Sequence, residues 1–143
     1  MTRVIKFALA LILILSLPLL ATAAEKHDEA EKKAVESAEA WLALVDQSKY
    51  GEAWDTASEL LKNAVSKEDF GKSLAAARKP LGKVKSREVK SKQYATSLPG
   101  APDGEYVVIQ FKTAFENKKS AVETITPMLD KDTKWRVSGY FIK

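Results

Sequence analysis

The last third of the chain alternates between apolar and mixed positions with a period of two, which is typical of half-buried β-strands. In residues 105–116, one alternating set is apolar except for a threonine, and the other set is mixed. The two sets are Val107, Ile109, Phe111, Thr113 and Phe115, and Tyr106, Val108, Gln110, Lys112 and Ala114. Residues 134–142 repeat the pattern. Their two sets are Trp135, Val137, Gly139 and Phe141, and Arg136, Ser138, Tyr140 and Ile142. We expect the first set of each strand to face a core.

Two further strands complete the predicted sheet. Residues 121–129 are rich in β-branched side chains, and the polar segments on either side have the lengths of hairpin turns. Pro127 lacks an N–H group for the ladder, so we expect a bulge there or a neighbouring strand too short to pair with it. Residues 83–98 carry five basic residues, which favours an edge strand whose lysines oppose aggregation, provided that a bulge keeps them on one side. A docking strip for anionic envelope lipid or polymer is the alternative.

The first half of the chain has the 3.6-residue periodicity of amphipathic helices. Apolar positions at helical spacing predict helices within 34–45, 50–64 and 70–81, the last one ended by Pro80 and Gly82. A charged segment, 24–33, precedes them. The predicted fold is therefore α+β, with three helices packed on a four-stranded antiparallel sheet in a single domain, 34–143.

The first 23 residues have the pattern of a secretory signal peptide. Arg3 and Lys6 precede an apolar run, and the small residues of 21–23 follow it as a cleavage site. The run is interrupted by Ser16 and Pro18 and is short for a membrane span of about 20 residues, so a retained anchor is the weaker alternative. We expect a periplasmic or secreted protein with no stable membrane anchor after cleavage.

Composition narrows the possible partners and chemistry. The chain has no cysteine, which excludes disulfides, lipidation at cysteine and thiolate ligands. Removal of Arg3 and Lys6 with the signal peptide lowers the formal charge of +4 by two, and so balanced a protein is not expected to bind nucleic acid.

Several stretches of the sequence resemble known families. The segments "AWLALVDQSKYGEAWDTAS" and "WRVSGYFI" are similar to the nuclear-transport-factor-2-like superfamily, also called the cystatin-like cone. The segments "SLPGAPDGEYVVIQF" and "AVETITPMLDKDTKWRVSGYFI" resemble a bacterial domain-of-unknown-function family, number 4019, over residues 34–142. The resemblance implies a strongly curved, cone-like sheet wrapped around the helices, sometimes with a pocket. It implies no activity.

No catalytic or metal-binding set is evident, so we predict a protein that is not an enzyme and needs no cofactor. The inward positions of the core strands include no carboxylate and no histidine, and the single histidine, His27, lies in the charged segment, where we expect it to be solvated. The alternative is an isomerase or dehydratase that uses a buried carboxylate, Asp46 or Asp55, together with Tyr50. A carboxylate lining an enclosed cavity would favour that alternative.

Two groups of residues are candidate binding sites. The aromatic residues expected on inward faces would either line a pocket or simply fill the core; these are Trp41, Trp54, Phe111 and Trp135. The opposite sheet face has an interface-like composition of Tyr106, Gln110, Arg136, Tyr140 and Ile142, although a solvated face is an equal alternative. We expect this face to support a weak homodimer or to dock an envelope protein, with Glu123 available to pair with Arg136.

The function predicted from the sequence is thus an exported binding domain for a protein partner or a small apolar ligand. A self-associating structural protein of the envelope is the remaining alternative.

Overall fold

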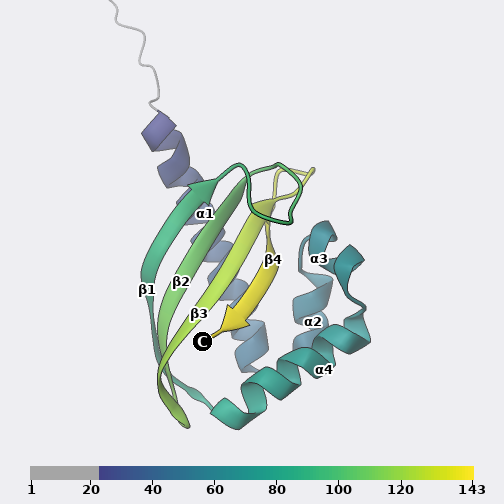
Figure 1. Cartoon of the computed structure of the whole chain (residues 1–143), viewed down its shortest axis with the longest axis vertical. Helices are drawn as coiled ribbons and strands as arrows, with labels where there is room; N and C mark the ends of the chain where they lie inside the picture. Colours follow the sequence, from purple (N-terminus) through teal and green to yellow (C-terminus); the bar gives the residue numbers. More distant parts are fainter. Residues whose placement is uncertain (1–22) are drawn as a thin grey trace, which may run out of the picture.

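The computed structural model describes residues 23–143, in which helices precede strands (Figure 1). The helices are α1 (Ala23–Asp46), α2 (Tyr50–Asp55), α3 (Glu59–Ala64) and α4 (Lys67–Arg78), followed by a 3₁₀ turn (Lys79–Leu81). The strands are β1 (Val84–Ala95), β2 (Tyr106–Phe115), β3 (Lys118–Leu129) and β4 (Trp135–Ile142). The predicted signal peptide lies outside the described residues, apart from Ala23. Among residues 23–143, no helix combines the length and the apolar character needed to cross a membrane.

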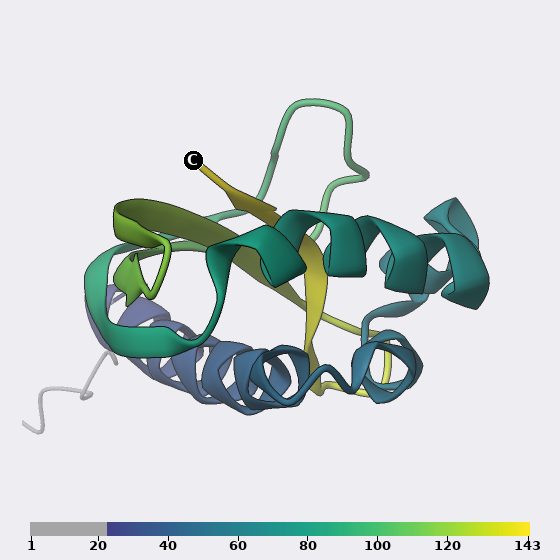
Figure 2. The ribbon, with the colours of Figure 1, turned by 90° about the horizontal axis from the view of Figure 1, so that it is seen from below.

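The sheet is an antiparallel meander with the strand order β1-β2-β3-β4. Helix α1 lies along one face of this sheet, and α2, α3 and α4 lie beyond the β4 edge (Figures 1 and 2). The core forms where α1 meets the sheet, and its main buried side chains are Ala38, Trp41, Leu42, Val107, Ile109, Phe111 and Ile125. The predicted α+β architecture, with helices followed by a four-stranded antiparallel sheet, is confirmed.

The helical half adds two details to the prediction. The charged segment 24–33 is helical and forms the first turns of α1. The predicted second helix, 50–64, is interrupted, so that residues 23–143 hold four α-helices instead of three. Ser58 causes the interruption: its hydroxyl accepts a hydrogen bond from the Leu61 N–H at 3.2 Å, and its own N–H donates to the Val137 carbonyl at 2.9 Å. The break therefore fixes α3 to the edge of β4.

The bulge expected at Pro127 is present. Thr126 pairs with Gly139, whereas Pro127 pairs with Val137, so Ser138 is the extra residue on β4. The Ser138 hydroxyl donates to the Thr126 carbonyl at 2.7 Å. The extra residue reverses the side-chain alternation of β4.

The reversal corrects the two predicted faces of β4. Val137 is buried as expected, but beyond the bulge Tyr140 packs against Trp41 in the core, and Phe141, expected inside, is 53% exposed.

The basic strand β1 is an edge strand with register shifts at Lys85 and Lys90, as predicted. Arg87 does not share the exposed side of the lysines, because its side chain is only 14% exposed and pairs with Asp46 and Glu123.

We expect Ser58→Ala to destabilise the protein by about 2 kcal/mol, the upper part of the range for a helix N-cap. Ser66→Ala is the matched control, because Ser66 caps α4 in the same way, accepting from the Asp69 N–H at 3.1 Å. Ser58 is fully buried and Ser66 is exposed, so water can replace the lost acceptor only at Ser66. Urea denaturation of both variants measures the difference, and equal losses would contradict this account.

Candidate functional site

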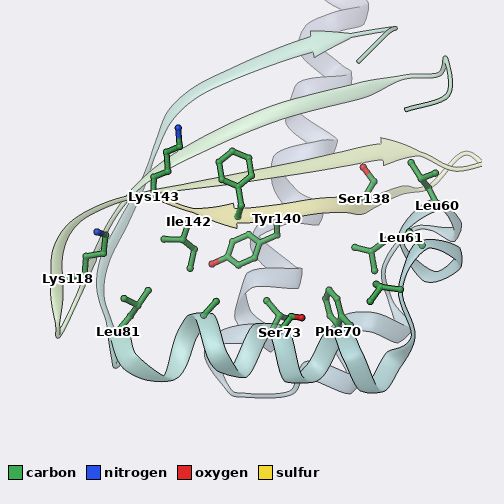
Figure 3. Close-up of a pocket in the computed structure, with 15 residues that line it drawn as sticks. Leu60, Leu61, Phe70, Ser73, Leu81, Lys118, Ser138, Tyr140, Ile142 and Lys143 are labelled. Atoms are coloured by element: carbon green, nitrogen blue, oxygen red, sulfur yellow. The ribbon is translucent and has the colours of Figure 1, made fainter. Parts of the chain in front are cut away.

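An apolar groove of about 890 Å³ lies between α3, α4 and β4. Figure 3 shows side chains of all three elements converging on it. Its apolar walls include Leu60 and Leu61 from α3, Phe70, Leu74 and Ala77 from α4, and Ile142 from β4. We call this hollow the α4–β4 groove.

Three local features of the sequence keep the α4–β4 groove open. Helix α4 buries Phe70, Leu74 and Arg78, which lie four residues apart on one stripe, while Ala77 presents only a methyl group to the groove. The break between α2 and α3 holds α3 against the first half of β4, because the Ser58 N–H donates to the Val137 carbonyl. The bulge at Ser138 then turns Tyr140 inward, so that its ring forms part of the groove wall.

Behind that wall lies a network of charged side chains that is buried at Glu123 and Arg78 and reaches solvent at Asp46. Glu123 on β3 is fully buried and accepts hydrogen bonds from Arg87 Nε at 2.7 Å, from Thr113 Oγ1 at 2.6 Å and from the Tyr140 hydroxyl. Arg87 on β1 also donates to Asp46, at the end of α1, at 2.7 and 3.0 Å. We call Glu123, Arg87, Asp46 and Arg78 the buried charge network.

The fourth member of the network comes from α4. Arg78 Nη2 donates to Asp46 Oδ1 at 2.7 Å, and the guanidinium lies 5.0 Å from the centroid of the Phe115 ring. Its Nε and Nη1 atoms are buried and have no hydrogen-bond partner among the described residues. Two carboxylates and two guanidinium groups make the network neutral overall, which limits the cost of burying it.

The pKa values of the network follow from these contacts. Burial opposes ionisation of Asp46, but hydrogen bonds from Arg87 and Arg78 outweigh it and lower the pKa of the carboxyl group. Burial would lower the pKa of Arg87, yet its bonds to Asp46 and Glu123 raise it instead. Burial, reinforced by the charge of Glu123, raises the pKa of Tyr140. The Tyr140 hydroxyl is therefore a fixed donor and a poor source of protons.

A second, smaller hollow of about 420 Å³ lies beside the network and has a polar lining that includes Asp46, Tyr50, Arg78, Lys79 and Lys83. It brings together Asp46 and Tyr50, which the enzymatic alternative predicted as a pair. Asp55 is elsewhere, exposed and paired with Lys67 at 2.9 Å. Within residues 23–143, no group of three or more histidine, aspartate or glutamate side chains could hold a metal ion.

The four aromatic residues predicted to line a pocket do not lie on the α4–β4 groove. Phe111 is 1% exposed in the core. The indole of Trp41 donates to the Ala53 carbonyl at 2.8 Å, and that of Trp54 donates to the Val65 carbonyl at 2.9 Å. Trp135 and Trp41 line a separate hollow of about 230 Å³.

The five residues of the predicted interaction face do not share one surface. Tyr106 is 1% exposed because residues of the β1–β2 connection cover it, and its hydroxyl donates to the Pro102 carbonyl at 2.6 Å. Tyr140 points into the core, and Ile142 lines the groove. Gln110 accepts from Ser91, and Arg136 pairs with Asp130 and Asp132. The predicted residues therefore do not form one continuous face, and Glu123, which is fully buried, is not available to pair with Arg136 of another copy.

Sequence reasoning missed the buried charge network, although a signal for it existed. Glu123 occupies the same alternating set of β3 as Ala121, Ile125 and Pro127, all of which are buried. A buried carboxylate requires a partner of opposite charge within reach. Arg87 is that partner and reaches Glu123 from β1, two strands away, but the pattern of basic residues in β1 concealed it. His27, which was expected to be solvated, is partly buried, because one face of its ring stacks on Tyr94 with ring centroids 4.1 Å apart.

We expect Glu123→Ala to destabilise the protein by about 3–5 kcal/mol, because Arg87 would lose its buried partner. Tyr140→Phe, which removes one donor to Glu123, should cost about 1–3 kcal/mol. Asp132→Asn is the control: its exposed pair with Arg136 lowers its pKa to about 2, but exposed pairs add little stability. Denaturant unfolding measures all three, and a loss at Asp132 equal to that at Glu123 would contradict the assignment.

Comparison with known proteins places the chain in a family but assigns no activity. A family model described as a protein of unknown function, DUF4019, matches residues 37–140. No curated protein matches the chain.

Proposed function

The chain belongs to the DUF4019 family, whose function is unknown, so we propose from the site itself that the protein is an exported, non-catalytic domain that binds a small apolar ligand. The observation that carries the proposal is the α4–β4 groove of about 890 Å³ with its apolar walls (Figure 3). Clefts of roughly 300–1,000 Å³ lined by apolar side chains with a few polar groups are typical of small-molecule sites. Removing such walls from water on binding supplies the driving force.

The wall of the groove is held in place before any ligand arrives. The Tyr140 ring lies 5.2 Å from the Trp41 ring, edge to face, and the Trp41 ring lies 6.1 Å from that of Phe70. The Tyr140 hydroxyl is fixed by Glu123, which Arg87 and Thr113 fix in turn. A pre-organised wall lowers the entropic cost of binding. The buried charge network thus supports the groove without taking part in chemistry.

The contacts of the carboxylates favour binding over catalysis. A general base must reach the proton that it removes. Glu123 is fully buried, does not line the groove, and is occupied by Arg87, Thr113 and Tyr140. Asp46 lines the smaller hollow with Tyr50, but the two arginines that lower its pKa also make it a weak base. The isomerase or dehydratase alternative therefore receives less support.

We also infer export and a superfamily placement. The basic start at Arg3 and Lys6, the apolar run and the small residues of 21–23 support cleavage by a signal peptidase and release into the periplasm or medium. The order of helices followed by an antiparallel sheet supports membership of the nuclear-transport-factor-2-like superfamily, with the sheet curved around the helices.

Ligand binding is tested with a neutral apolar fluorophore, N-phenyl-1-naphthylamine, whose emission rises on entering an apolar site. Ala77→Trp should abolish or strongly reduce the rise in emission, because Ala77 lines the groove and the indole would fill it. Ala76→Trp is the matched control, since Ala76 is the adjacent exposed residue of α4 and does not line the groove. Circular dichroism verifies that both variants fold. Equal binding by the two variants, or no binding by the unsubstituted protein, would refute the proposal.

Export is tested by the intact mass of the protein recovered from the periplasm or medium after expression of the full chain. We expect the mass of a chain that begins at Ala24, because cleavage after Ala23 follows the small-residue pattern. Full-length protein in the membrane fraction would contradict this prediction.

A further inference from the structure

Within residues 23–143, the sheet edge that borders the α4–β4 groove has no strand beside it. β4 is the last strand of the meander, and α4 faces it across the groove (Figure 3). The backbones of Val122 and Lys143 exchange both hydrogen bonds at 2.9 Å. In an antiparallel pair, successive residues of a strand alternately face the partner strand and face away from it. The N–H and C=O groups of Phe141 and Lys143 therefore face β3, and those of Tyr140 and Ile142 face the open edge.

The open part of this edge begins after the bulge. Before the bulge, the Val137 carbonyl is already bonded to the Ser58 N–H at 2.9 Å. Outside the ladder with β3, neither Tyr140 nor Ile142 forms a backbone–backbone hydrogen bond within residues 23–143. Both residues line the groove, and Figure 3 shows their side chains directed toward α4. Unpaired backbone groups in such a row are a template for another strand, so they specify the chemistry of the ligand.

The β4 edge lacks the protection that the other edge of the sheet has. β1 carries the exposed residues Lys85, Lys90 and Lys92, and lysines on an edge oppose pairing with another strand. Residues 139–142 of β4 include no charge and no proline. Helices α3 and α4 lie beyond this edge instead (Figures 1 and 2). A single extended chain fits such a recessed edge better than a second copy, whose own edges are either basic or equally recessed.

We propose that the α4–β4 groove binds an extended peptide segment, which adds a fifth strand to the sheet beside β4. This inference rests on the proposed function, because the same apolar walls drive binding, and it specifies the ligand as a peptide with alternating apolar side chains. Peptide residues opposite Tyr140 and Ile142 place their side chains on the same face of the sheet, toward Phe70 and Leu74 of α4. Main-chain hydrogen bonds then supply affinity, and the apolar wall selects every second side chain.

The test uses a capped hexapeptide that alternates valine and threonine, with a lysine added at each end for solubility. Displacement of N-phenyl-1-naphthylamine from the mature protein gives its Kd, and amide hydrogen exchange followed by NMR locates the contact. At a peptide concentration of ten times Kd, exchange at Tyr140 and Ile142 should slow about tenfold, because their N–H groups gain partners. Exchange at Phe141, whose N–H already faces β3, should change much less.

Two variants of one residue separate the backbone from the side chain. Ile142→Pro and Ile142→Ala both remove the isoleucine side chain, but only proline also removes the N–H group. This N–H faces away from β3, so proline leaves the ladder in place. Compared with Ile142→Ala, Ile142→Pro should bind the peptide about 5-fold more weakly, the effect of one hydrogen bond, and the fluorophore with similar affinity. Circular dichroism verifies that both variants fold.

The outcomes separate this inference from the proposed function. Slower exchange at Tyr140 and Ile142, with weaker peptide binding by Ile142→Pro, would support strand addition. Binding of the fluorophore but not of the peptide, displacement without slower exchange at these two residues, or equal peptide affinity of the two variants would overturn strand addition and leave the apolar site intact. Failure of both probes to bind would overturn both proposals. A dimer of the protein that closes the β4 edge to the peptide would overturn the inference in favour of a second copy.

Discussion

The structure depends on one buried carboxylate, Glu123. A fully buried charge costs several kcal/mol unless a partner of opposite charge is placed beside it. Its partners come from strands on both sides: Arg87 from β1, Thr113 from β2 and Tyr140 from β4. Arg87 then extends the network to Asp46 at the end of α1, and Asp46 binds Arg78 at the end of α4. The four strands and two helices must therefore be in register before the charges are satisfied.

This constraint explains why the sequence predicted the elements better than their contacts. The alternation in β2 was read correctly, and all five predicted inward side chains, from Val107 to Phe115, are buried. Pro127 signalled the bulge because a missing N–H is a local property. The consequence of the bulge, which turns Tyr140 inward and Phe141 outward, depends on which strand carries the extra residue. That choice is made by pairing between β3 and β4 and leaves no periodic signal in either strand.

The candidate site was less predictable than the strands, because it too depends on contacts between distant segments of the chain. The α4–β4 groove is made by the approach of α3 and α4 to one strand edge, and the break at Ser58 that positions α3 interrupts an apolar pattern typical of one continuous helix. Trp41 and Trp135 were predicted to line a pocket because they are aromatic, but they pack in or beside the core and not on the groove.

The buried charge network and the α4–β4 groove lie on opposite sides of Tyr140. Tyr140 contributes its ring to the groove and its hydroxyl to Glu123, so the polar side of the wall fixes the shape of the apolar side. Arg78 acts similarly: its guanidinium is buried against Phe115 and Asp46, which ties the end of α4 to α1 and the sheet. The far end of α4 is held by the apolar contacts of Phe70 and Leu74 and by the exposed pair of Lys67 with Asp55. A ligand that enters the groove thus meets a β4 wall whose shape is fixed by the charged side chains behind it.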